Sequence, residues 1–195
     1  MAKVRYYMIK NKTDLKYYLE KDVEHHGTGL PKFKDFVLKN EWWYLYHYLY
    51  HLRHVEYYIN SVPRNILLKI VYKALYLFHF IKYKRLSSLL HLYIYPNTCG
   101  AGLKICHFGD FTHVAKGCVI GDNCVLLPGV VLGKKDEYDV STTIGDNCYL
   151  GLGVKILGSV TVGNNVVVGA NAVVTKDIPA NVVVAGVPAE IIKKR

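Results

Sequence analysis

The chain has 195 residues, of which 51% are hydrophobic, and its formal net charge is +10. This composition supports a packed core and excludes a disordered chain. Residues 1–95 hold sixteen Lys or Arg and seven Asp or Glu, a net charge of +9, whereas residues 96–195 are close to neutral. The basic half carries no nucleic-acid-binding motif, so we predict no nucleic-acid partner. Its charge instead suggests, as a hypothesis, weak association with an anionic membrane or glycan surface.

The chain carries no signal for export or membrane insertion. Its N-terminal sequence, MAKVRYYMIKNK, is charged throughout and does not resemble a signal peptide. The most apolar window, residues 66–81, is interrupted by Lys69 and Lys73, which argues against a membrane span. We therefore expect a cytoplasmic protein.

Three helical stretches are predicted in the first half, over residues 13–26, 35–60 and 64–91. Thr13 is the expected N-cap of the first, and prolines separate the three stretches. In the third we expect the basic residues to face outward. The side chains expected to face inward are Leu67, Ile70, Val71, Ala74, Leu75, Phe78 and Ile81.

From residue 114 onward an aliphatic residue recurs every six positions. The residues in this frame are Val114, Ile120, Leu126, Leu132, Ile144, Leu150, Ile156, Val162, Val168 and Val174. A small or β-branched residue stands four places after most of them, and glycine directly follows six of them. A period of six fits neither an α-helix nor a simple strand. It is typical of a hexapeptide β-helix, in which each hexad forms one side of a triangular turn.

The hexad frame also explains several individual residues. Cys118, Cys124 and Cys148 occupy the small inward position, so we predict buried thiols rather than disulfides or zinc ligands. We expect the glycines to supply backbone conformations that other residues resist. The frame breaks once, between Leu132 and Ile144, which predicts an extruded loop. The fold class is therefore α+β, with a helical N-terminal domain over residues 1–95 and a left-handed parallel β-helix over residues 96–195.

A β-helix is a scaffold, so its function depends on a site. The segment GLKICHFGDFTHVAKG precedes the regular repeats and contains two histidines, His107 and His113. A histidine can act as a general base at neutral pH. Spacing alone leaves both histidines open as catalytic residues and favours His107.

The stretch from Gly102 to the C-terminus resembles the hexapeptide-repeat acyltransferases, and serine acetyltransferases in particular. The motifs that carry this resemblance are the His107 segment, IGDNCYLGLGVKILGSVTVGNNVVVGANAVVTKDIP and AGVPAEII. In the first half, YYLEKDVEHHG and LRHVEYYIN resemble the helical part of short serine-acetyltransferase-like proteins linked to surface-polysaccharide synthesis.

The resemblance implies an enzyme that transfers an acetyl group from acetyl-CoA to a hydroxyl. It implies His107 as the general base and a homotrimer, or a dimer of trimers joined through residues 1–90, with acetyl-CoA between adjacent coils. It implies no metal site. The residues expected to contact acetyl-CoA are Gly133, Gly151, Gly153, Ala170, Thr175, Lys176 and Lys193. A backbone N–H near Gly133 or Gly151 is expected to stabilise the oxyanion.

The chain departs from serine acetyltransferases where the acceptor binds. Those enzymes have an aspartate before the coils and another before the catalytic histidine, where this chain has Tyr93 and Cys106. Their second histidine, at the end of the extruded loop, is also missing. We therefore predict a saccharide acceptor, with the loop residues Lys134 to Asp139 near it, and keep L-serine as an alternative. Asp110 is a candidate for orienting His107.

Two functions of other classes stay open. A metal-dependent β-helix enzyme such as a carbonic anhydrase needs three imidazoles, whereas the coil half contains only His107 and His113. A non-catalytic trimeric scaffold is the remaining alternative, and it would not bind acetyl-CoA.

Overall fold

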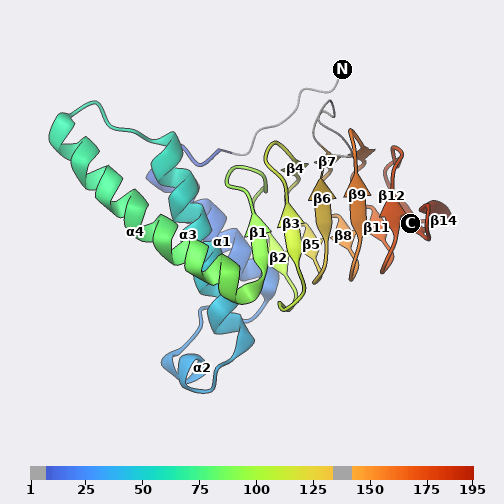
Figure 1. Cartoon of the computed structure of the whole chain (residues 1–195), viewed down its shortest axis with the longest axis horizontal. Helices are drawn as coiled ribbons and strands as arrows, with labels where there is room; N and C mark the ends of the chain where they lie inside the picture. Colours follow the sequence, from blue (N-terminus) through green and yellow to red (C-terminus); the bar gives the residue numbers. More distant parts are fainter. Residues whose placement is uncertain (1–7, 134–141) are drawn as a thin grey trace.

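The computed structural model of the chain describes residues 8–133 and 142–195. Four helices come first: α1 (Lys12–His26), α2 (Phe33–Val37), α3 (Glu41–Asn60) and α4 (Ile66–Leu90). They gather at one end of the molecule, and a coil of short strands extends away from them (Figure 1). The helical first half is confirmed. The loop residues Lys134 to Asp139 lie outside the described residues.

The helix predicted over residues 35–60 is in fact two helices. Lys39 adopts a left-handed backbone conformation with φ of 51°, which ends α2. The side chain of Asn40 then accepts a hydrogen bond from the Trp42 N–H at 3.1 Å and caps α3. The predicted N-cap of the first helix was also wrong, because Asn11 rather than Thr13 caps α1, through the Asp14 N–H.

The strands are short and wind through three sheets. The first sheet contains β1 (Leu92–Ile94), β3 (Thr112–Val114), β6 (Val131–Gly133), β9 (Lys155–Leu157) and β12 (Val173–Val174). The second contains β4 (Val119–Ile120), β7 (Thr143–Ile144) and β10 (Thr161–Val162). The third contains β2 (Lys104–Ile105), β5 (Val125–Leu126), β8 (Tyr149–Leu150), β11 (Val167–Val168), β13 (Val182–Ala185) and β14 (Glu190–Lys194).

Successive strands from β2 to β12 visit the third, first and second sheets in turn, as a three-sided coil requires. The pairings are parallel except that of β13 with β14. The predicted parallel β-helix is therefore confirmed.

The inside of the coil is filled by the aliphatic frame. All ten residues of the six-residue frame, from Val114 to Val174, are at most 1% exposed. Cys118, Cys124 and Cys148 are buried free thiols, as predicted. One continuous cluster of apolar side chains runs from Trp42 on α3 to Val184 on β13. Because this core crosses from the helices into the coil, the helices complete the first turns of the coil.

The glycines that follow the frame residues serve a purpose other than the predicted one. Gly121 and Gly145 do not have positive φ; the left-handed corners are held by asparagines such as Asn123 and Asn147 and by other glycines such as Gly153. A Cβ on Gly121 would lie 2.5 Å from the backbone carbon of Gly145 in the next turn. Glycine is therefore needed at these corners because stacked turns approach closely.

This close approach predicts that Gly121→Ala destabilises the coil. The added methyl group must push two turns apart, at a cost of about 1–3 kcal/mol, which corresponds to a drop of several degrees in Tm. Gly133→Ala is the matched control, since a Cβ there meets no atom of the described residues within 4 Å. Thermal melts followed by circular dichroism measure both. Equal Tm values for the two variants would contradict this account.

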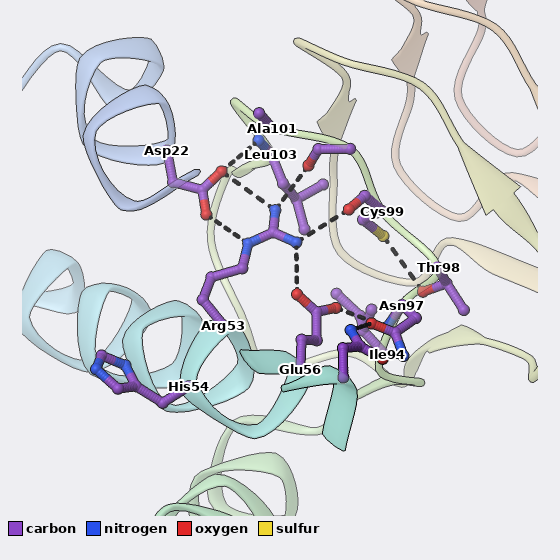
Figure 2. Close-up of polar contacts among 12 residues, drawn as sticks. Asp22, Arg53, His54, Glu56, Ile94, Asn97, Thr98, Cys99, Ala101 and Leu103 are labelled. Atoms are coloured by element: carbon purple, nitrogen blue, oxygen red, sulfur yellow. Dashed lines mark hydrogen bonds and ion pairs between the residues drawn. The ribbon is translucent and has the colours of Figure 1, made fainter. Parts of the chain in front are cut away.

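A buried ion cluster fastens the helices to the first turn of the coil (Figure 2). Arg53 on α3 is fully buried and donates to both oxygens of Asp22 on α1, at 2.8 and 3.2 Å, and to Glu56 at 3.1 Å. It also donates to the backbone carbonyl oxygens of Cys99 at 2.9 Å and Gly100 at 2.7 Å. Burial opposes its charge, but the two carboxylates raise the pKa of Arg53 well above its ordinary value.

The two carboxylates of this cluster also bind the coil directly. Asp22 accepts from the Leu103 N–H at 2.8 Å, and Glu56 accepts from the Asn97 N–H at 2.7 Å. The cluster therefore satisfies backbone groups of the segment that leads into the coil, and it fixes α1 and α3 against that segment.

Removing the guanidinium should therefore be costly. Arg53→Met leaves two buried carboxylates without their partner, and the expected loss of unfolding free energy is about 3–5 kcal/mol. Chemical denaturation of the variant measures this loss. Lys21→Met is the control, because it breaks the exposed Lys21–Glu24 pair and should leave stability almost unchanged. An Arg53→Met variant as stable as the control would refute the role of the cluster.

The predicted inward face of α4 was wrong. The side chains that α4 packs against α3 and β1 are largely polar or aromatic and include Tyr76, His79, Phe80, Tyr83 and Leu90. Tyr76, His79 and Tyr83 recur at helical spacing and form the side of α4 that faces α3. The aliphatic residues occupy the opposite side of α4. In the parts of the chain that the structure describes, no helix is long and apolar enough to cross a membrane.

Candidate active site

His107 lies where the chain leaves β2 and turns toward β3. Six residues connect these strands, against four between β5 and β6 in the next turn, so the His107 segment bulges out of the coil. His107 itself has a left-handed backbone conformation, with φ of 68°. Residues other than glycine rarely adopt this conformation, and such strain concentrates at functional sites. The side chain is 74% exposed.

A carboxylate from the helical part holds the His107 ring. Nδ1 of His107 lies 2.7 Å from Oε2 of Glu41, and Oε1 of Glu41 accepts from the Phe108 N–H at 3.0 Å. Glu41 is the first residue of α3, next to the Asn40 cap, so the start of the helix sets its position. A carboxylate accepts hydrogen bonds, so Nδ1 must donate and Nε2 is left to accept a proton.

Glu41 is the functional residue that sequence reasoning missed. It lies 66 positions before His107 and belongs to no motif that marks it. The candidate for this role was Asp110, but the carboxylate on Nδ1 of His107 is Glu41. One signal could have found it: an acidic residue directly after an asparagine N-cap is held rigidly at a helix start.

The other residues of the segment have different surroundings. Burial raises the pKa of the Cys106 thiol, which keeps it protonated at neutral pH. His113 is on β3, paired in register with Tyr93 on β1, and its ring stacks on Phe111 with 5.7 Å between ring centres. Burial lowers the pKa of His113. His113 and Tyr93 thus lie on the outer face of the first sheet. Of the two histidines, His107 is the one that contacts the Glu41 carboxylate.

A pocket of about 220 Å³ opens beside His107. Its walls come from the helices and from β2, and the lining residues are His26, Thr28, Asn40, Glu41, Trp42, Leu45, Lys104, Ile105, Cys106 and His107. The ring of His26 lies 4.2 Å from that of Trp42, and Nε2 of His26 accepts from the Ile105 N–H at 3.4 Å. Burial, with nearby Lys104 and His25, lowers the pKa of His26 to about 4. The pocket therefore combines a histidine base, a carboxylate, the Lys104 amine and neutral polar groups.

Several of the expected acetyl-CoA residues share one corner of the coil with His107. Ile105, Leu126, Leu150 and Val168 align across the third sheet, so the corners that follow them are stacked. These corners hold His107, Pro128, Gly151 to Gly153, and Ala170. Neighbouring strands are about 4.8 Å apart, so this row spans about 14 Å. A Cβ on Gly151 would lie 2.8 Å from the Ala170 nitrogen, which explains the glycine.

The remaining expected residues lie elsewhere. Gly133 is the last residue of β6 and Thr175 directly follows β12, so the two share a second row, and Lys176 follows Thr175. Lys193 is on β14, opposite Val183. Thr175, Lys176 and Lys193 are exposed. The Gly151 N–H donates to the Val168 carbonyl at 2.9 Å, so in this chain it is already used by the coil and is not free for an oxyanion.

Across residues 8–133 and 142–195, no group of three His, Cys, Asp or Glu side chains is placed to hold a metal ion.

The coil matches a known repeat. The family model described as bacterial transferase hexapeptide (six repeats) matches residues 104–134 and 141–176. The galactoside O-acetyltransferase of Escherichia coli strain K12 is 44% identical over 87 residues, 38% of this chain and 43% of that protein. The serine acetyltransferase of Synechococcus elongatus is 35% identical over 95 residues, 48% of this chain and 38% of that protein. The chain thus spans about two fifths of the length of these curated relatives.

Solved structures extend the likeness to the helices. The serine acetyltransferase from Brucella abortus strain S19 aligns with a TM-score of 0.67 and 26% identity, covering 93% of this chain and 70% of that one. Its complex with coenzyme A gives a TM-score of 0.66 at the same identity, covering 94% and 69%. The coil therefore matches the hexapeptide repeat of bacterial transferases over residues 104–134 and 141–176. The chain as a whole resembles serine acetyltransferase structures, and its coil resembles curated acetyltransferases.

The buried histidines predict acid sensitivity. Burial lowers the pKa values of His26, His51 and His79 to about 4, and Nδ1 of His51 lies 2.9 Å from Nδ1 of His79. The unfolded chain takes up these protons near pH 6.5, whereas the folded chain resists them until about pH 4. The stabilisation is therefore complete above pH 6.5 and is lost as the pH falls toward 4.

Tm measured between pH 8 and pH 4 should stay level and then decline below about pH 6.5. The double variant His51→Phe/His79→Phe removes two of the three groups and should decline less steeply. A Tm that is constant from pH 7 to pH 4.5 would be inconsistent with these pKa shifts.

Proposed function

We propose that the protein is an acetyl-CoA-dependent O-acetyltransferase whose acceptor is a saccharide hydroxyl. The observation that carries the proposal is the His107–Glu41 contact of 2.7 Å at the mouth of a pocket, at the start of the row of small corner residues. Its relatives and structural neighbours are acetyltransferases by name, which supports the same chemistry.

In this mechanism His107 is the base and Glu41 positions it. Nε2 of His107 takes the proton from the acceptor hydroxyl as the oxygen attacks the thioester carbonyl carbon. The tetrahedral intermediate collapses when the carbon–sulfur bond breaks. Nε2 returns its proton to the departing thiolate, so the imidazole ends neutral. Glu41 stabilises the imidazolium form between these two steps, as an orienting carboxylate does in other histidine bases.

The coil supplies the surface for the acyl donor. Small residues at Gly151, Gly153 and Ala170 allow a pantetheine arm to approach the backbone, and Lys176 and Lys193 carry charges suited to phosphates. Gly133 and Thr175 belong to the neighbouring row. The coenzyme A complex of the Brucella abortus neighbour supports acyl-CoA as the donor class. Such a donor site lies between adjacent coils, so we propose a homotrimer or a dimer of trimers acting in the cytoplasm.

The composition of the pocket supports a saccharide acceptor. Serine needs a carboxylate for its ammonium group, and Glu41 is the one acidic side chain among the described lining residues. That carboxylate is already engaged by His107 and the Phe108 N–H. Thr28 instead offers a neutral hydroxyl group, and the aromatic ring of Trp42 lines the same pocket. A neutral hydroxyl group and an aromatic wall suit a sugar ring.

L-Serine is the second candidate, because the helices that line the pocket also align with the serine acetyltransferase structures. The deciding experiment measures release of free thiol from acetyl-CoA with serine, sugars and nucleotide sugars as acceptors. Turnover with a saccharide and weak turnover with serine supports the proposal. A serine kcat/KM of about 10⁴ M⁻¹s⁻¹ or more would replace it with serine acetylation. If the protein does not bind acetyl-CoA at all, the non-catalytic trimeric scaffold would be the remaining function.

The two central residues have distinguishable roles. His107→Ala removes the base, so kcat should fall by roughly 10²–10⁴ with acetyl-CoA affinity nearly unchanged. Glu41→Gln keeps the shape but can no longer stabilise the imidazolium, so kcat should fall by roughly 10–10³. Asp110→Asn is the matched control and should keep most of the activity. Full turnover in His107→Ala would overturn the assignment and direct attention to His113.

A further inference from the structure

The outer side of α4 is an exposed apolar surface. Leu67 is 70% exposed, Ile70 62%, Val71 50%, Phe78 52% and Ile81 43%. Five further large apolar residues of the helix are also exposed: Ile66, Leu68, Leu75, Leu77 and Leu89. A folded protein seldom leaves so many large apolar side chains of one helix in water without a partner.

This surface is broad rather than a narrow seam. At 3.6 residues per turn, the residues from Ile66 to Ile81 that are apolar and exposed cover an arc of about 200° around α4. The opposite side, which includes Tyr76, His79 and Tyr83, packs on the rest of the protein. Helix pairs use a narrower stripe, whereas a helix lying in a lipid surface buries a wide face. Figure 1 shows α4 at the edge of the molecule, extending away from the coil.

All Lys, Arg, Asp and Glu residues of α4 are of the basic kind. The helix contains five basic residues and no Asp or Glu: Lys69, Lys73, Lys82, Lys84 and Arg85. At 100° per residue, Lys73 and Lys84 fall at one margin of the apolar arc and Lys82 near the other. Long lysine side chains at such margins can reach anionic head groups while their stems cover apolar surface.

A groove continues the apolar surface on the side of Lys69 and Lys73. Its volume is about 330 Å³, and its other lining residues are Tyr58, Ile59, Val62, Tyr72 and Tyr76. Tyrosine is well suited to the boundary between lipid and water, because its ring is apolar and its hydroxyl is polar. The groove and the two amines therefore extend the same amphipathic surface onto the end of α3.

We propose that the outer face of α4 docks on an anionic lipid bilayer, with Leu67, Ile70 and Phe78 entering the head-group region. A second copy of α4 is a poorer occupant. Its approach would bring ten basic side chains of the two helices together without an acidic partner on either. An anionic bilayer satisfies both the apolar face and the charge. This docking is independent of the acetyl-transfer proposal, because it involves no residue of the His107 pocket.

Flotation of the full chain with vesicles tests the proposal. We expect binding to phosphatidylcholine vesicles that contain phosphatidylglycerol, loss of binding at high salt, and little binding to phosphatidylcholine alone. Lys69→Ala/Lys73→Ala should weaken binding roughly thirtyfold, from about 1 kcal/mol per basic residue. Ile70→Asp should weaken it by about tenfold or more, because it places a charge in the apolar face.

Leu38→Asp is the matched control, since Leu38 is 75% exposed but lies outside α4, and it should bind like the unmodified chain. Melting temperatures confirm that all variants fold. Absence of flotation with anionic vesicles at low salt would overturn the proposal, as would equal losses in Leu38→Asp and Ile70→Asp. A change of mass in light scattering for Ile70→Asp, without vesicle binding by the unmodified chain, would instead identify an interface between copies.

Discussion

The guanidinium of Arg53 is the charge on which the arrangement of the two halves depends. A buried arginine is tolerated only when its donors are satisfied, and here they reach two carboxylates and two backbone carbonyl oxygens of the segment entering the coil. That requirement fixes the position of α3 along the coil. Glu41 lies twelve residues earlier on the same rigid helix, about 18 Å away along its axis. The ion cluster therefore determines where the carboxylate meets His107.

Stacking of the turns is the second constraint on the structure. Each turn must align its frame residues with those above and below, so a corner position becomes a row along the coil. His107 begins one such row, and its longer connection is the point at which the regular coil is interrupted. A strained histidine at one end and small residues further along give the row a direction, which suits an elongated substrate with one reactive end.

The sequence predicted the coil well because its cause is local. A six-residue repeat states which side chains point inward, and Val114, Ile120 and Leu126 are buried as that repeat requires. The helical half was harder, since contacts between distant segments decide it. The helix start at Glu41 does not indicate that its carboxylate contacts His107, 66 residues later. A propensity pattern also does not show the left-handed turn at Lys39, which splits one expected helix. The faces of α4 were exchanged because aromatic packing, rather than aliphatic packing, joins it to α3.

The pocket beside His107 has one wall from the helices and one from the coil. Thr28 and Asn40 stand in the helical wall, whereas Lys104 and Ile105 belong to the coil. Changes at Thr28 and Asn40 leave the stacked turns intact, whereas His26 and Glu41 in the same wall accept hydrogen bonds from the coil. Substitutions in the helical wall can therefore change which acceptor the pocket binds, while the wall formed by the coil stays the same.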